Sequence, residues 1–187
     1  MIKSNEENNE ETQKRISRDY VEKILARVLL VLYLVLLIWL VLFKLQFNIL
    51  SVFNYNHRSL NLNPFNAPLK TNGRINFGEM IDNVIIFIPF GLFFSVNFKK
   101  ARFLPKLAII FGFSIVCELI QYIFAIGATD ILDVITNTLG GFLGLELYNL
   151  LNKFVNNKKL DRVIIFVGIL LLLILIYYRV HVLRLRY

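Results

Sequence analysis

The fold is decided by residues 107–137, which read LAIIFGFSIVCELIQYIFAIGATDILDVITN. Two apolar runs meet in this stretch, and both carry acidic side chains. Glu118 lies inside the first run, whereas Asp130 and Asp133 open the second. A carboxylate in hydrocarbon is costly unless it is protonated, paired or turned toward a polar cavity. We therefore expect a membrane protein in which these residues form a polar site.

The composition of the whole chain also indicates a membrane protein. Apolar residues make up 57% of the 187 positions and charged residues 18%, so the chain is more apolar and less charged than a soluble domain. The net charge of +8 does not require nucleic acid, because the basic residues alternate with apolar runs and can contact lipid headgroups. The single cysteine, Cys117, provides neither a disulfide framework nor a CxxC metal pair. We expect the lipid bilayer as a partner, with no nucleic acid, metal or cofactor.

The apolar runs predict an all-α fold, a polytopic membrane helical bundle of about five transmembrane helices. A polar arm at residues 1–23 precedes the bundle at 24–178, and a basic tail follows at 179–187. The arm is expected to be disordered or loosely helical. The spans are predicted at residues 24–43, 84–96, 107–126, 131–151 and 163–178.

The second run and the loop before it are the least regular parts of the prediction. Residues 84–96 are short for a span and contain Pro89 and Gly91, so they fit a kinked span or a re-entrant segment. Apolar residues on both sides lengthen the run, which favours a span. The loop at 44–82 is rich in asparagine and proline and is expected to be irregular, with a short interfacial helix near 47–53.

The distribution of basic residues predicts the orientation of the bundle. With the N-terminus inside, fourteen basic residues fall in inner segments and seven in outer segments. Inner segments of membrane proteins carry the excess of lysine and arginine. We therefore expect the N-terminus inside, the loop at 44–82 outside, and the connection at 127–130 outside.

Polar side chains from consecutive spans are expected to converge at the outer end. Glu118 and Gln121 are three residues apart and share a helix face, as do Asp130, Asp133 and Asn137. The short connection at 127–130 predicts a tight antiparallel hairpin that brings these faces together. The cluster would also receive Asn83 at the start of the second span, and Arg58, Lys70 and Arg74 are candidate counter-charges.

Each of these residues also has a structural interpretation. Thr129 or Asp130 is suited to cap the following helix, and Asp133 complements its positive end. Asn137 can hydrogen-bond a neighbouring helix. The small residues Gly140, Gly141 and Gly144 are better explained by close helix packing. Glu118 lies too far inside its run for capping, which favours a functional role.

Four short motifs resemble the VanZ-like family when they are taken in order. They are RSLNLNPF at 58–65, NVIIFIPFG at 83–91, ELIQ at 118–121 and DILDVITNTLGG at 130–141. The resemblance places a VanZ-like core at about residues 58–151. Its polar motif positions are Arg58, Asn61, Asn83, Glu118, Gln121, Asp130, Asp133 and Asn137, and its packing positions are Pro89, Gly91, Gly140, Gly141 and Gly144.

The resemblance implies a small, multi-pass integral protein of the bacterial plasma membrane. The founding member resembles an accessory determinant of resistance to glycopeptide antibiotics, teicoplanin in particular. Many members carry a basic residue just before the acidic pair, where this chain has Gly127 and Ala128. The ion pair expected in those members therefore cannot be carried over to this chain. Here Arg58 or Arg74 would have to supply the positive charge.

Three functions remain open from the sequence. The leading hypothesis is a non-enzymatic protein whose outward-facing polar site recognises an envelope component or a glycopeptide antibiotic. The alternative is a membrane enzyme that acts on a lipid-linked cell-wall intermediate, although zinc-protease, nucleophile-elbow and phosphate-loop motifs are missing from the sequence. The third is a structural or accessory bundle whose polar residues fix the register of the helices.

Overall fold

The computed structural model describes residues 2–43, 57–63 and 77–182, and it confirms an all-α helical fold. Within these residues the elements are α1 (Ile2–Phe43), β1 (His57–Asn61), α3 (Phe77–Asn97), α4 (Phe103–Phe124), β2 (Ile126–Asp130), α5 (Ile131–Phe154) and α6 (Asn157–Val182).

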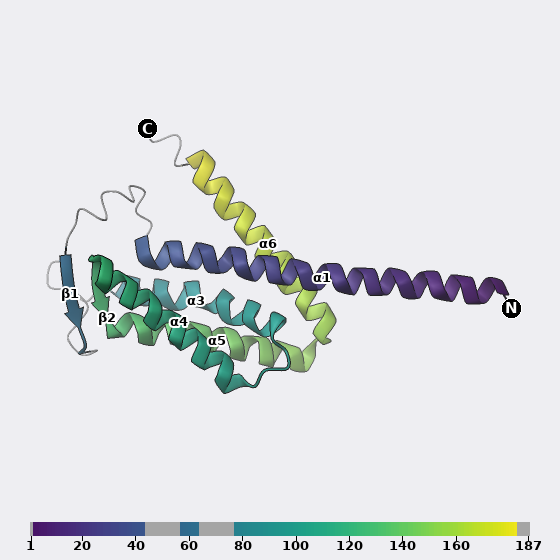
Figure 1. The fold of residues 1–187 in the computed structure, drawn as a ribbon, viewed down its shortest axis with the longest axis horizontal. Coiled ribbons are helices and arrows are strands. Elements are labelled where there is room, and N and C mark those ends of the chain that lie inside the picture. The colour runs from purple at the N-terminus through teal and green to yellow at the C-terminus, as the bar shows by residue number, and fades with distance from the viewer. Residues whose placement is uncertain (1, 44–56, 64–76, 183–187) are drawn as a thin grey trace.

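The helices form an elongated bundle with two different ends (Figure 1). Both strands lie at one end, which we call the strand end. The connection from α3 to α4 and that from α5 to α6 lie at the other, and we call this the basic end because residues 99–106 and 153–162 hold eight lysines and arginines. The N-terminal part of α1 projects beyond the basic end, and the C-terminal part of α6 leads away from the bundle (Figure 1).

Three helices within the described residues are long and apolar enough to cross a membrane. They are Asn9–Leu42 within α1, Phe77–Asn97 and Phe103–Phe124. The second apolar run belongs to a single helix through Pro89, whose 21 residues reach about 31 Å at about 1.5 Å per residue. This length favours a span over a re-entrant segment. Spans along α5 and α6 remain predictions.

The chain forms two strands where the sequence analysis predicted none. β1 and β2 pair in parallel, with His57 opposite Ile126 and Asn61 opposite Asp130. As predicted, α4 and α5 run antiparallel as neighbours (Figure 1), but their connection at 127–130 is an extended strand and not a tight turn. The reason is Ala125, which ends α4 in the left-handed conformation with φ 52° and ψ 36°. The chain then turns back along α4 as an extended segment before α5 begins.

The loop and the N-terminal arm contain more regular secondary structure than the sequence predicted. The loop at 44–82 was expected to be irregular apart from a short interfacial helix, but it contains β1 and the start of α3. The interfacial helix expected near 47–53 lies outside the described residues. Residues 2–23 continue α1 as regular helix. Ion pairs join this arm to α6, with Lys158 to Asp19 at 2.6 Å and Arg162 to Glu22 at 2.7 Å.

The core is centred on the aromatic side of α3. Phe87 and Phe90 are fully buried, and their rings contact Phe113 of α4 edge to face at 6.2 and 5.2 Å between centroids. On the other side, Phe93 contacts the ring of Tyr33 in α1 at 5.2 Å. These contacts fix α3 between α1 and α4, and therefore fix Asn83 at its N-terminal end.

The closest helix contact is made between α3 and α5, where glycines replace side chains. A Cβ atom on Gly144 would lie 2.1 Å from the Ile88 carbonyl oxygen, and one on Gly91 would lie 2.3 Å from the Gly141 oxygen. A Cβ on Gly140 would lie 2.2 Å from the Val84 oxygen. The two backbones can approach this closely only because no Cβ lies between them.

Candidate functional site

Glu118 brings a buried carboxylate to the strand end of the bundle. Its side chain is 4% exposed, and Oε2 accepts a hydrogen bond from the backbone N–H of Asp130 at 3.1 Å. The carbonyl oxygen of Glu118 accepts from the Thr129 hydroxyl at 3.2 Å. Both bonds depend on the left-handed turn at Ala125, because it brings β2 back along α4. Glu118 therefore ties the start of α5 to the middle of α4.

Asp130 connects three elements at the point where β2 becomes α5. Its Oδ1 accepts from the Leu132 N–H at 2.9 Å, so Asp130 is the N-cap of α5. Its Oδ2 accepts from the Asn61 amide at 3.1 Å, which comes from the end of β1. Asn61 in turn accepts from the Asn63 N–H at 3.2 Å. The Asp130 carboxylate thus caps α5 with one oxygen and binds the Asn61 side chain with the other.

A second group of bonds joins α3 to the first turns of α5. The Asn83 amide donates to Asp133 Oδ1 at 2.8 Å and to the Thr136 hydroxyl oxygen at 3.5 Å. Thr136 also donates to the Leu132 carbonyl oxygen of its own helix at 2.9 Å. Asn83 and Asp133 are each partly exposed, so this group is accessible from outside the bundle.

We call the polar residues of the strand end the polar network. Its members come from β1, β2 and three helices, and they are Asn61, Asn83, Glu118, Thr129, Asp130, Asp133 and Thr136. Of these, Thr129 and Thr136 were absent from the sequence-based set. The sequence did contain a signal for both residues. Thr129 is next to Asp130, and Thr136 follows Asp133 by three residues, which places it on the same helix face.

Two predicted site residues make their hydrogen bonds elsewhere in the bundle. Gln121 donates from Nε2 to the Val41 carbonyl oxygen of α1 at 2.9 Å. Asn137 donates from Nδ2 to the Ser114 hydroxyl oxygen of α4 at 2.9 Å. Both side chains are 1% exposed. Both bonds join neighbouring helices inside the bundle. For Asn137, this is the structural interpretation that the sequence offered.

Arg58 is placed only by its backbone, which lies opposite Gly127 in the β1–β2 register. The other candidate counter-charges, Lys70 and Arg74, lie outside the described residues. Within the described residues, no group of three or more His, Cys, Asp or Glu side chains is arranged to hold a metal ion. The polar side chains of the network are carboxylates, amides and the hydroxyls of Thr129 and Thr136.

The comparisons with known proteins agree with one another. The family described as VanZ/LLP1 matches residues 30–152. The chain is 70% identical over 165 residues to the curated protein "Protein VanZ" of Enterococcus faecium, which covers 88% of this chain and 98% of that relative. No solved structure matches the chain.

Proposed function

Because the chain belongs to the VanZ/LLP1 family, we propose that it is a multi-pass protein of the bacterial plasma membrane that contributes to glycopeptide resistance of the teicoplanin type. The proposal assigns the polar network an outward-facing position. There it recognises an envelope component or the antibiotic itself. The observation that carries the proposal is the 70% identity with Protein VanZ of Enterococcus faecium over nearly all of that relative.

The geometry of the polar network supports recognition without catalysis. Three carboxylates hold parts of the chain in place, since Glu118 accepts from the Asp130 backbone, Asp130 from Leu132 and Asn61, and Asp133 from Asn83. A general acid or base needs a proton-transfer geometry toward a substrate, whereas these bonds serve the fold. The partly exposed members are the ones a ligand can reach, and they are Asn61, Asn83, Asp130 and Asp133.

Expression of the wild-type chain in a susceptible Gram-positive host is expected to raise the inhibitory concentration of teicoplanin. It should leave that of an antibiotic with an intracellular target unchanged. Asp133→Asn is expected to abolish the rise, because it removes the negative charge while keeping an oxygen that can accept from Asn83. Inhibitory concentrations are measured for strains matched in membrane abundance of the protein.

The matched control is Glu146→Gln, which neutralises an exposed carboxylate farther along the same helix. It should retain the full rise. If the wild-type chain gives no rise, the proposed function is wrong. If Asp133→Asn and Glu146→Gln give the same inhibitory concentration of teicoplanin at equal abundance, the polar network is not the recognition site.

A further inference from the structure

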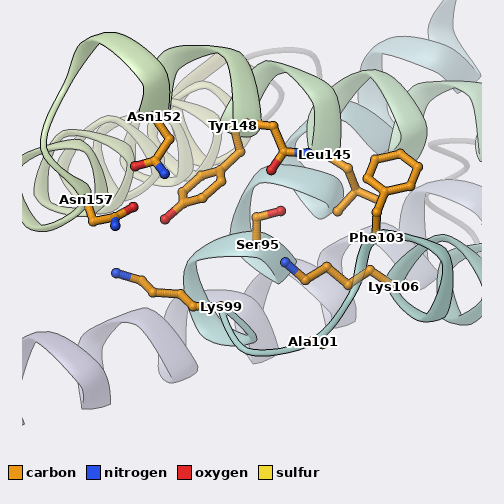
Figure 2. Close-up of a pocket in the computed structure, with 10 residues that line it drawn as sticks. Ser95, Lys99, Ala101, Phe103, Lys106, Leu145, Tyr148, Asn152 and Asn157 are labelled. Carbon is orange, nitrogen blue, oxygen red and sulfur yellow. The ribbon is translucent and has the colours of Figure 1, made fainter.

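A polar cavity lies at the basic end, well separated from the polar network. Its volume is about 230 Å³. Its walls come from the last turns of α3 and α5, the first turns of α4 and α6, and the connection after α3 (Figure 2). The polar residues of its lining include Ser95, Lys99, Lys106, Tyr148 and Asn152.

Lys106 is a buried cation in the wall of this cavity. Its residue is 7% exposed, and Figure 2 shows its ammonium group extending toward Ser95. No carboxylate in the described part of the chain lies within 4.0 Å of its Nζ, whereas Lys99, Lys158 and Arg162 at the same end each have such a partner. A buried charge is unfavourable unless it is paired and hydrogen-bonded. Lys106 therefore lacks a negative partner among the described residues.

Two further polar groups in the wall have no hydrogen-bond partner among the described residues. They are the Ser95 hydroxyl oxygen and the Asn152 Oδ1 atom. Ser95 is 1% exposed, so bulk water cannot readily satisfy it. Buried polar atoms are nearly always hydrogen-bonded in native proteins, to the chain, to water or to a ligand. The serine hydroxyl can donate to a ligand oxygen, and an amide can present either of its two polar atoms.

The electrostatics of the cavity favour an anion. Lys99 forms an ion pair with Asp161, and the other oxygen of Asp161 accepts from the Tyr148 hydroxyl at 2.9 Å. The carboxylate of Asp161 is thus already engaged. Among the described residues, the cavity lining itself contains no acidic side chain. The positive charge of Lys106 consequently dominates the space between α3, α4 and α5.

We propose that this cavity binds a phosphate group, supplied as the headgroup of an anionic phospholipid or as free phosphate. Phosphate oxygens accept from ammonium, hydroxyl and amide groups, which are the groups present here. Water can occupy a polar cavity of this size, but it brings no negative charge to Lys106. The proposal concerns the opposite end of the bundle from the polar network, so it stands or falls independently of the proposed function.

Binding is measured by isothermal titration calorimetry on the full-length protein in detergent. The ligands are short-chain phosphatidylglycerol, inorganic phosphate and short-chain diacylglycerol. We expect at least one phosphate-bearing ligand to bind, and diacylglycerol to give no signal. Lys106→Gln is expected to weaken binding about tenfold, which corresponds to about 1.4 kcal/mol. Ser95→Ala should weaken it as well, and this variant keeps the test informative if Lys106→Gln does not fold.

The matched control is Lys159→Gln, which removes an exposed positive charge at the same end without touching the cavity lining. Its affinity should stay close to that of the wild type. Binding of phosphatidylglycerol alone identifies a lipid headgroup, and binding of inorganic phosphate with the same dependence on Lys106 identifies free phosphate. If neither ligand binds, or if Lys106→Gln and Lys159→Gln weaken binding equally, the proposal is overturned.

Discussion

Gly144→Ala is expected to lower the thermal unfolding midpoint of the detergent-solubilised protein. The new Cβ would lie 2.1 Å from the Ile88 carbonyl oxygen and 3.0 Å from the Gly91 Cα. These are backbone atoms, so a change of side-chain rotamer cannot relieve the clash. α3 and α5 would have to move apart, and overpacking of this kind costs about 1–3 kcal/mol. Circular dichroism at 222 nm (the helical signal) during heating measures the midpoint.

Gly112→Ala is the matched control for this substitution. Gly112 lies within α4, and no atom of the described residues comes within 4 Å of the Cβ that would be added there. Alanine is favoured over glycine inside a helix by about 0.5–1 kcal/mol, so the midpoint should stay the same or rise. An equal fall for Gly112→Ala and Gly144→Ala would show that the α3–α5 contact is not as close as described.

Glu118→Ala is expected to destabilise the junction between α4 and α5. The substitution removes the acceptor of the Asp130 N–H, whose bond measures 3.1 Å, from a site where Glu118 is 4% exposed. Loss of one partner from a buried hydrogen bond costs about 1–3 kcal/mol. The same thermal midpoint measures the effect. Glu118→Gln should lower the midpoint less than Glu118→Ala, because the glutamine amide oxygen can still accept from the Asp130 N–H.

The control for Glu118 is Glu146→Ala, since Glu146 is exposed on α5. Removal of an exposed carboxylate of this kind is expected to change the midpoint little. Equal shifts of the midpoint in both alanine variants would contradict this role of Glu118. So would a Glu118→Gln variant as destabilising as Glu118→Ala, because the charge rather than the accepting oxygen would then be responsible.

The helices could be predicted from the sequence because the length of an apolar run reports directly on a membrane span. Their ends were less predictable. α3 begins at Phe77, before the second apolar run, because polar residues can extend a helix beyond its apolar part. The strands could not be predicted, since β1 is short and its partner β2 lies 69 residues later in the chain. Short strands depend on such a distant partner for their stability.

Part of the polar network could also be predicted from the sequence. A carboxylate within an apolar run, such as Glu118, stands out from its surroundings, and Asp130 and Asp133 follow at helical spacing. The partner of each side chain depends on how every helix is rotated, and the sequence does not report this rotation. Gln121 and Asn137 illustrate the limit, because they bond to α1 and to Ser114. The cavity around Lys106 was not found because its residues come from four separate helices.

The proposed outward position of the strand end is tested most directly by labelling with a membrane-impermeant maleimide. Single cysteines replace Leu62, which is 67% exposed at the strand end, and Lys159, which is exposed at the basic end, in a Cys117→Ala background. If the strand end faces outward, Leu62→Cys is labelled in intact cells and Lys159→Cys is labelled only after the cells are opened. Labelling of Lys159→Cys in intact cells, with Leu62→Cys protected, would contradict the proposed position.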